Sequence, residues 1–202
     1  MLIALAIGLG KYRHLGRSLK IITIYTLVSI ISAIISYLVT RIFKNNLPMF
    51  HIQTIIEYIF IYLFYREELK ENESISKFIK FSFFPVMLFL LINSIFIQKL
   101  TEFNSNSRSL QELVVIVYVL IWFYKIMTEM NIKKLEEEPA FWINAGFLVY
   151  FSATVLLFFF SNYLLHFRQD LNLYIWGFHA VFLTLLYLSI SIGLWKAPKT
   201  PR

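Results

Sequence analysis

The sequence has 202 residues, of which 58% are hydrophobic and 15% are charged, and its formal net charge is +7. Soluble domains contain about 45–50% apolar and about 25% charged residues, so this composition excludes an ordinary soluble domain and indicates a membrane protein. There is no cysteine, which excludes disulfides and thiolate metal sites. The basic residues fall between apolar runs, so we interpret them as topology signals and expect a lipid bilayer, with no nucleic acid, as the partner.

Seven apolar segments predict an all-α, polytopic transmembrane helix bundle that forms a single domain over residues 1–202. The first segment, residues 2–10, is too short to span a bilayer, because its apolar run measures only about 12 Å as a helix. We expect it to be either the end of a helix that starts upstream or a genuine stub. Six full spans are expected at residues 21–43, 48–65, 77–97, 110–128, 140–166 and 171–196. Ser29, Ser32 and Ser36 stand at spacings that permit close helix packing.

The distribution of lysine and arginine predicts the orientation of the bundle. Most of the 19 basic residues lie around alternate connections, at residues 11–20, 66–80, 125–134 and 196–202. The other connections carry only Arg41, Lys44, Lys99, Arg108 and Arg168. The positive-inside rule therefore places the N-terminus outside and the C-terminus in the cytoplasm of a multi-pass inner (cytoplasmic) membrane protein.

Two ionisable residues mark a predicted pocket within the apolar segments. A carboxylate at the centre of a membrane helix costs roughly 2.5–3.5 kcal/mol on insertion scales, so Glu57 is a candidate functional residue. Counted from the outer helix ends, Glu57 lies about 13 Å deep and His179 about 12 Å deep. We predict that these two residues face one another across a pocket that opens to the outer side. The candidate pocket residues are His51, Glu57, Asn93, Glu112, Asn162, Trp176, His179 and Tyr187.

The chemistry of this pocket has several interpretations. A Glu–His pair can act as acid and base, relay a proton, or serve only as packing between helices. A zinc site would need His51 and His179 together with His166 or Glu57, and there is no HExxH motif. Haem ligation is disfavoured because His51 and His179 differ in depth, and Lys125 and Lys196 stand at helix ends, which disfavours a retinal Schiff base. We therefore predict no metal and no cofactor.

Several motifs resemble a known group of proteins. They are Leu47-Pro48-Met49-Phe50-His51 with Glu57, the run Asn104-Ser105-Asn106-Ser107-Arg108, and Phe141-Trp142-Ile143-Asn144-Ala145-Gly146 followed by Tyr150-Phe151-Ser152. In these motifs the chain resembles a family of small, uncharacterised seven-helix inner-membrane proteins of bacteria. The resemblance implies a multi-helix inner-membrane protein and assigns no chemistry. Members begin with a complete first helix, and this chain departs from the family there.

Three classes of function fit the sequence, which has no established catalytic motif. The first is a sensor or signalling module that binds a small molecule or lipid in an outward-facing polar pocket and acts through a cytoplasmic protein partner. The second is an intramembrane enzyme for a lipid or another apolar substrate, with Glu57 and His179 as acid and base. The third is a channel or transporter, which the lack of internal repeats and the apolar inner half of the bundle disfavour.

Overall fold

The computed structural model describes residues 1–129, 134–167 and 172–198, without the side chains of residues 165–167 and 172. Within these residues the chain forms helices and no strand, which confirms the predicted all-α class. Several predicted features lie outside the described residues: the start of the last segment at Leu171 and the basic residues Lys133, Arg168, Lys199 and Arg202. The predicted turn at residues 167–170 lies outside them except for its first residue. The side chain of His166 also lies outside them.

Six of the described helices are long and apolar enough to span a membrane. They are α2 (Arg17–Phe43), α3 (Leu47–Glu68), α4 (Glu73–Ile92, continued by the π-helix η2, Asn93–Ile97), α5 (Ser105–Glu129), α6 (Pro139–Phe159) and α8 (Asn172–Lys196). The chain is therefore a multi-pass membrane protein. The shorter helices are α1 (Leu2–Lys11), η1 (Tyr12–His14), η3 (Leu135–Glu137) and α7 (Ser161–Phe167). The count of seven segments and the orientation in the membrane stay predictions.

Most helix boundaries lie within four residues of those predicted, and two differ by more. Helix α5 begins at Ser105, five residues before the predicted Leu110, so Arg108 lies inside a helix and not in a loop. The predicted span at residues 140–166 is divided at Phe160, which stands between α6 and α7. Both differences fall near polar or aromatic residues at one end of the bundle, where hydropathy alone does not locate a helix end.

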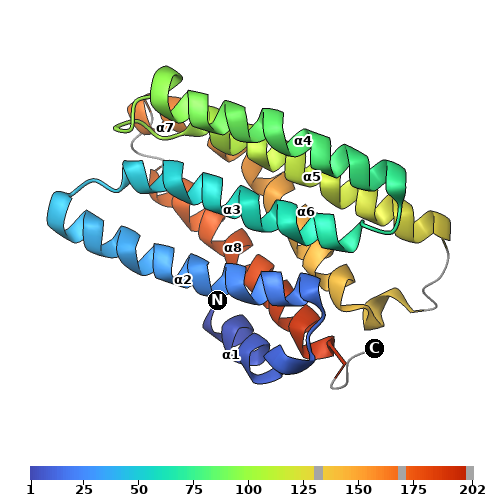
Figure 1. The fold of residues 1–202 in the computed structure, drawn as a ribbon. Coiled ribbons are helices and arrows are strands. Elements are labelled where there is room, and N and C mark those ends of the chain that lie inside the picture. The colour runs from blue at the N-terminus through green and yellow to red at the C-terminus, as the bar shows by residue number, and fades with distance from the viewer. Residues whose placement is uncertain (130–133, 168–171, 199–202) are drawn as a thin grey trace.

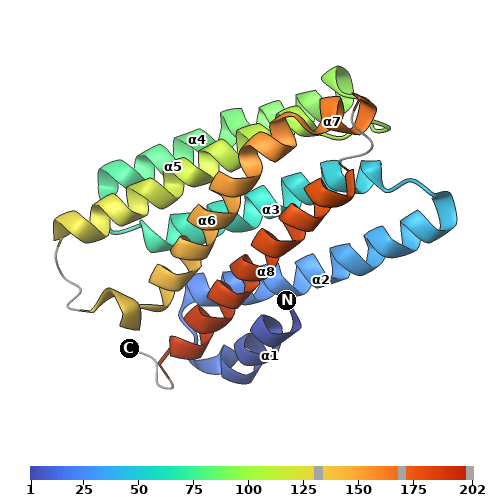
Figure 2. The same ribbon diagram turned by 180° about the vertical axis from the view of Figure 1, so that it is seen from behind.

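The long helices run alternately in opposite directions, so their connections gather at two ends (Figure 1). We call one the Gly16 end, which holds residues 12–16, 69–72, 134–138 and 197–198. The other, the Asn46 end, holds residues 44–46, 98–104 and 160. Helix α1 packs against α2 and α8 near the Gly16 end (Figure 2). The side-chain nitrogen of Lys11 donates there to the carbonyls of Trp195 and Ala197.

Helices α6 and α8 make the most extensive contact between two helices in the bundle. Two glycines let them approach closely. A Cβ atom on Gly146 of α6 would lie 2.7 Å from Cβ of Ser189 in α8. A Cβ atom on Gly193 of α8 would lie 2.7 Å from the carbonyl oxygen of Pro139 at the start of α6. Small residues at such positions let membrane helices approach until their backbones are in contact. Helices α6 and α8 therefore form one tightly packed unit.

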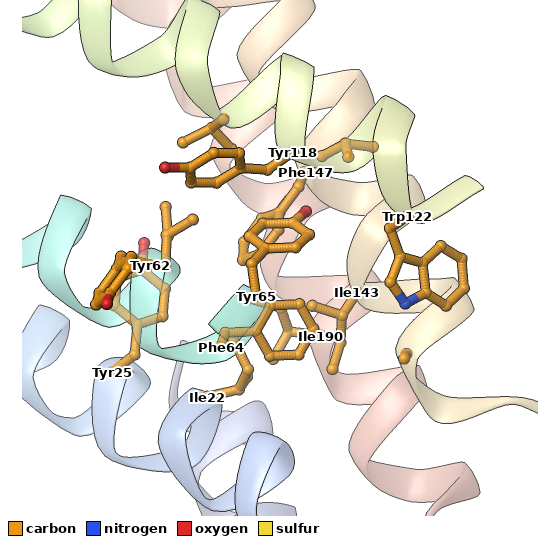
Figure 3. Close-up of a cluster of buried hydrophobic side chains, with 14 of the residues drawn as sticks. Ile22, Tyr25, Tyr62, Phe64, Tyr65, Tyr118, Trp122, Ile143, Phe147 and Ile190 are labelled. Atoms are coloured by element: carbon orange, nitrogen blue, oxygen red, sulfur yellow. The ribbon is translucent and has the colours of Figure 1, made fainter. Parts of the chain in front are cut away.

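The half of the bundle towards the Gly16 end is filled by large side chains. Figure 3 shows Phe64 and Tyr65 of α3 beside Phe147 of α6, with Tyr118 and Trp122 of α5 nearby. All five are almost completely buried. Tyr65 donates to Oδ1 of Asn144 at 2.7 Å, so its hydroxyl is satisfied inside the core. This aromatic core separates the two ends of the molecule.

Helix α2 is packed over only part of its length. Its buried residues are Leu19, Ile22, Thr23, Tyr25 and Thr26, all in the part nearest the Gly16 end. From residue 27 onward the side chains of α2 are partly or fully exposed. Ser29, Ser32 and Ser36, whose spacing permits close helix packing, lie on the wall of a cavity. The second half of α2 thus forms one side of the site described next.

Candidate functional site

A cavity of about 450 Å³ lies between the second half of α2 and helices α3 and α8. Helix α2 contributes a row of mostly small residues from Tyr25 to Thr40, which measures about 22 Å along the helix. Phe50 and Ile56 of α3, Phe158 of α6 and Leu183 of α8 supply apolar walls. One wall is polar, and its side chains come from five different helices. A cavity of this volume is within the range that holds small molecules.

The centre of the polar wall is an ion pair between Glu57 of α3 and Arg108 of α5. Nη1 of Arg108 donates to Oε2 of Glu57, and both side chains are nearly nine-tenths buried. Nε2 of Gln111 donates to the same oxygen at 3.0 Å. The hydroxyl of Tyr25 donates to Oε1 of Glu57 at 2.8 Å. Glu57 therefore accepts hydrogen bonds from three side chains, as a buried carboxylate requires.

Arg108 connects this carboxylate to the histidine across the cavity. Its Nη2 donates to the hydroxyl of Tyr150 at 3.1 Å, and that hydroxyl lies 3.0 Å from Nε2 of His179. Arginine only donates, so the single hydroxyl proton of Tyr150 is available to Nε2 of His179. In the tautomer that uses this proton, Nε2 accepts and the ring proton is on Nδ1. Glu57 and His179 are thus linked through two side chains and not by a direct contact.

A second carboxylate, Glu112, lies behind Arg108 and is completely buried. Nε of Arg108 is 3.2 Å from Oε1 of Glu112. The hydroxyl of Thr154 is 3.0 Å from the same oxygen and 2.9 Å from the carbonyl oxygen of Tyr150. Oε2 of Glu112 has no hydrogen-bond partner in the described part of the chain. One guanidinium therefore contacts two buried carboxyl groups.

The structure divides the eight predicted pocket residues into two groups. Glu57, His179 and Tyr187 line the cavity. Glu112 lies behind them against Arg108, and Trp176 packs on His179 with its ring centroid 5.8 Å away. The remaining three, His51, Asn93 and Asn162, lie in a separate polar cluster at the Asn46 end.

This second cluster, which we call the amide cluster, consists of His51, Asn93, Ser94, Gln98, Phe103, Ser105, Ser107 and Asn162. Nδ2 of Asn93 donates to Gln98 and to Ser107, both at 2.8 Å, and Nδ2 of Asn162 donates to the carbonyl of Phe103 at 2.8 Å. The ring of His51 is 3.1 Å from Oγ of Ser94. These side chains bond one another and the backbone, so the cluster holds the loop at residues 98–104 in place.

Four residues of the polar wall were not predicted: Tyr25, Arg108, Gln111 and Tyr150. A signal for Arg108 exists in the sequence, because it stands four residues before Glu112, the spacing of an ion pair on one helix face. The polar run before it resembles a loop and conceals that spacing. No sequence pattern distinguishes Tyr25 and Tyr150 from the other tyrosines.

Among the described residues, no three His, Asp or Glu side chains lie close enough together to hold a metal ion. His51 and His179 belong to the two different polar clusters. The combination of both histidines with Glu57 that a zinc site would need is therefore not assembled at one point. What the polar wall offers is hydrogen bonding, one ion pair and an imidazole.

Comparison of the chain with protein-family models, with curated proteins and with solved structures finds no match. The resemblance to small seven-helix bacterial membrane proteins therefore stays a prediction. The function has to be argued from the site alone.

Proposed function

We propose that this protein is a membrane-embedded sensor that binds a small amphipathic ligand in the cavity and passes the signal to a cytoplasmic protein partner. The observation that carries the proposal is the cavity itself, which has apolar walls and one polar wall built from five helices. Such a combination of apolar surface with a few converging polar groups is typical of small-molecule sites. The ligand's apolar part would lie along α2, and its polar part would meet Tyr187 and His179.

The aromatic core favours a sensor over a channel or transporter. Between the cavity and the Gly16 end, Phe64, Tyr65, Phe147 and Phe151 fill the space and are completely buried. A conducting protein needs a polar path or a mobile gate between its two ends. The polar contacts of the described core side chains there are local: Tyr65 bonds Asn144, and the hydroxyl of Tyr118 contacts those of Tyr58 and Ser82.

The Gly16 end is suited to a partner. Its described connections are short and carry both basic and acidic residues, and none of them is large enough to form an output domain. A second cavity, of about 620 Å³, opens there. Its polar lining residues are His14, Ser18, Glu68, Glu137, Glu138 and Lys196. Orientation by the positive-inside rule would place this end in the cytoplasm of a bacterial inner membrane and the ligand cavity on the outer side.

Cysteine labelling tests the proposal directly, because the sequence contains no cysteine of its own. We expect Ser32→Cys, on the cavity wall, to react with a membrane-impermeant maleimide added from outside and not from inside. Lys99→Cys, in the exposed loop at the same end, is the positive control. Ile34→Cys, on the opposite face of α2 and 55% exposed, should face lipid and react slowly from either side.

Two outcomes of this experiment would contradict the proposal. If Ser32→Cys reacts only from inside, the cavity does not open outward. If it fails to react from either side while Lys99→Cys reacts, the cavity is filled or sealed and does not receive a ligand from water.

An intramembrane enzyme is the second candidate, and one observation favours it. The hydroxyl of Tyr150 lies between Arg108 and His179 at hydrogen-bond distance from both, which resembles an acid–base arrangement. An enzyme should convert a component of a lipid extract in a reaction that is lost in His179→Ala and detectable by mass spectrometry. A sensor should leave the extract unchanged.

A further inference from the structure

The hydrogen bonds around Glu112 indicate its protonation state. The hydroxyl of Thr154 has one proton but lies within bonding distance of both Oε1 of Glu112 and the carbonyl oxygen of Tyr150. A carbonyl oxygen cannot donate, so the hydroxyl proton must serve Tyr150 if that bond is made. In that arrangement a protonated Oε1 of Glu112 donates to the hydroxyl oxygen of Thr154, which is an acceptor as well as a donor. A neutral carboxylic acid at Glu112 satisfies both contacts together.

The unpaired oxygen of Glu112 supports the same assignment. Oε2 is buried and has no partner among the described residues, although a carboxylate normally accepts several hydrogen bonds. As half of an anion, this oxygen would carry negative charge inside the bilayer with no donor bonded to it. As the carbonyl oxygen of an acid it is an ordinary buried dipole, which costs far less to leave unpaired.

The charge balance of the polar wall leads to the same conclusion. Glu57 and Arg108 already form a buried pair, and Glu57 accepts from Tyr25 and Gln111 as well. An ionised Glu112 would add a second negative charge beside a single guanidinium. Charged groups within a membrane are tolerated when they are paired, and a net charge there is unfavourable.

We infer that Glu112 holds a proton, that the polar wall has no net charge, and that the site therefore accepts an amphipathic ligand whose polar group is uncharged. This inference rests on the proposed function, since it specifies the ligand of the same cavity. An ammonium or carboxylate group on the ligand would bring an uncompensated charge into a wall that is already balanced. A hydroxyl, ester, amide or ketone brings none, and it can bond Nδ1–H of His179, a cavity-lining ring.

Infrared spectroscopy of the whole protein in lipid vesicles tests the state of Glu112. The wild type should show the carbonyl stretch of a protonated carboxylic acid, above the amide I band. Glu112→Gln should lose that absorption, and Glu136→Gln, a change at an exposed glutamate outside the polar wall, should keep it. An identical absorption in wild type and Glu112→Gln, or none in the wild type, overturns the inference without touching the proposed function.

The ligand class is tested with three probes that share one chain: dodecanol, dodecylamine and dodecanoate. Each is added to vesicles at the same membrane mole fraction, and the rate of Ser32→Cys labelling is measured with Lys99→Cys as the control. We expect dodecanol to slow Ser32→Cys labelling several-fold and to leave Lys99→Cys unchanged. Stronger protection by the amine or the carboxylate overturns the inference. Failure of all three to protect counts against the proposed binding function instead.

Discussion

Arg108 is the residue on which the polar wall depends. Its guanidinium contacts Glu57, Glu112, Gln111 and Tyr150, and its centre lies 5.0 Å from the ring centroid of Phe158. Arg108 thereby joins Glu57 of α3 to Tyr150 of α6 and to Glu112 on its own helix. Removing any charged member leaves another charge buried and unpaired, which is the costly case for ion pairs inside proteins.

At Glu57 we expect the amide and alanine substitutions to differ. Glu57→Ala removes the carboxylate to which Tyr25, Gln111 and Arg108 all donate. This loss should lower the free energy of unfolding by about 3–5 kcal/mol. Glu57→Gln keeps an acceptor oxygen and should cost less. Unfolding of both variants in mixed micelles with a denaturing detergent measures the difference. Equal losses would show that hydrogen bonding by residue 57 contributes nothing.

Double-mutant cycles should rank the links of the network. Glu57 and Arg108 are in contact, so their coupling free energy should be about 1–3 kcal/mol. Glu57 and His179 communicate through Arg108 and Tyr150, and we expect a smaller but measurable coupling between them. A Glu57–His179 coupling of zero would falsify the predicted connection across the cavity. A coupling larger than that of Glu57 with Arg108 would contradict the observed geometry.

The sequence singles out Glu57 and His179, because ionisable residues inside apolar segments are rare and carry a known cost. Arg108 was not found, since it follows a run of asparagine and serine that is typical of a loop. Its burial depends on a carboxylate 51 residues away in the sequence. Contacts over such distances leave no local pattern, so the assembly of the wall becomes visible only in three dimensions.

Among the elements, α6 and α8 depend most on close backbone approach. Gly193→Ala would place a methyl group 2.7 Å from the carbonyl oxygen of Pro139, which cannot move without moving α6. We expect a loss of about 1–3 kcal/mol in unfolding free energy, as for overpacked cores. Gly177→Ala on the same helix meets nothing within 4 Å and should be neutral or stabilising by up to about 1 kcal/mol.

The two glycine variants share a helix and a substitution, so their difference isolates the contact with α6. Thermal unfolding in detergent, followed by the loss of helical circular dichroism, measures both. Equal melting temperatures would show that α6 and α8 are not held at the distance described.

Element positions follow from hydropathy, whereas several element ends do not. The six long helices coincide with the six predicted full spans, since about 20 apolar residues in a row have few alternatives. The five extra residues at the start of α5 are polar, and they remain helical because Asn93, Gln98 and Asn162 bond their serines. Side-chain bonds from other elements thus extend this helix beyond its apolar run.

For the whole molecule, the predicted orientation is open to a direct test. Reporter fusions after Asn106 and after Arg202 should report opposite sides of the membrane, with the Arg202 fusion in the cytoplasm, because most basic residues gather at the Gly16 end. A paired phosphatase and fluorescent-protein readout gives opposite signals for the two sides. An external C-terminus would invert the cavity as well, and the ligand would then enter from the cytoplasm.

The uneven packing of α2 has a mechanical consequence. The helix is held from Leu19 to Thr26 and unburied beyond, while α6 and α8 form a rigid frame across the cavity. It therefore resembles a lever with its pivot beside Tyr25 and a loosely packed arm of about 21 Å from Thr26 to Thr40, which Gln53 of α3 contacts at the carbonyl of Ser32. A rotation of about 5° at the pivot displaces Thr40 by about 2 Å. When the cavity widens, the part of α2 before Tyr25 therefore turns against α1. Helix α1 is in turn bonded through Lys11 to the end of α8.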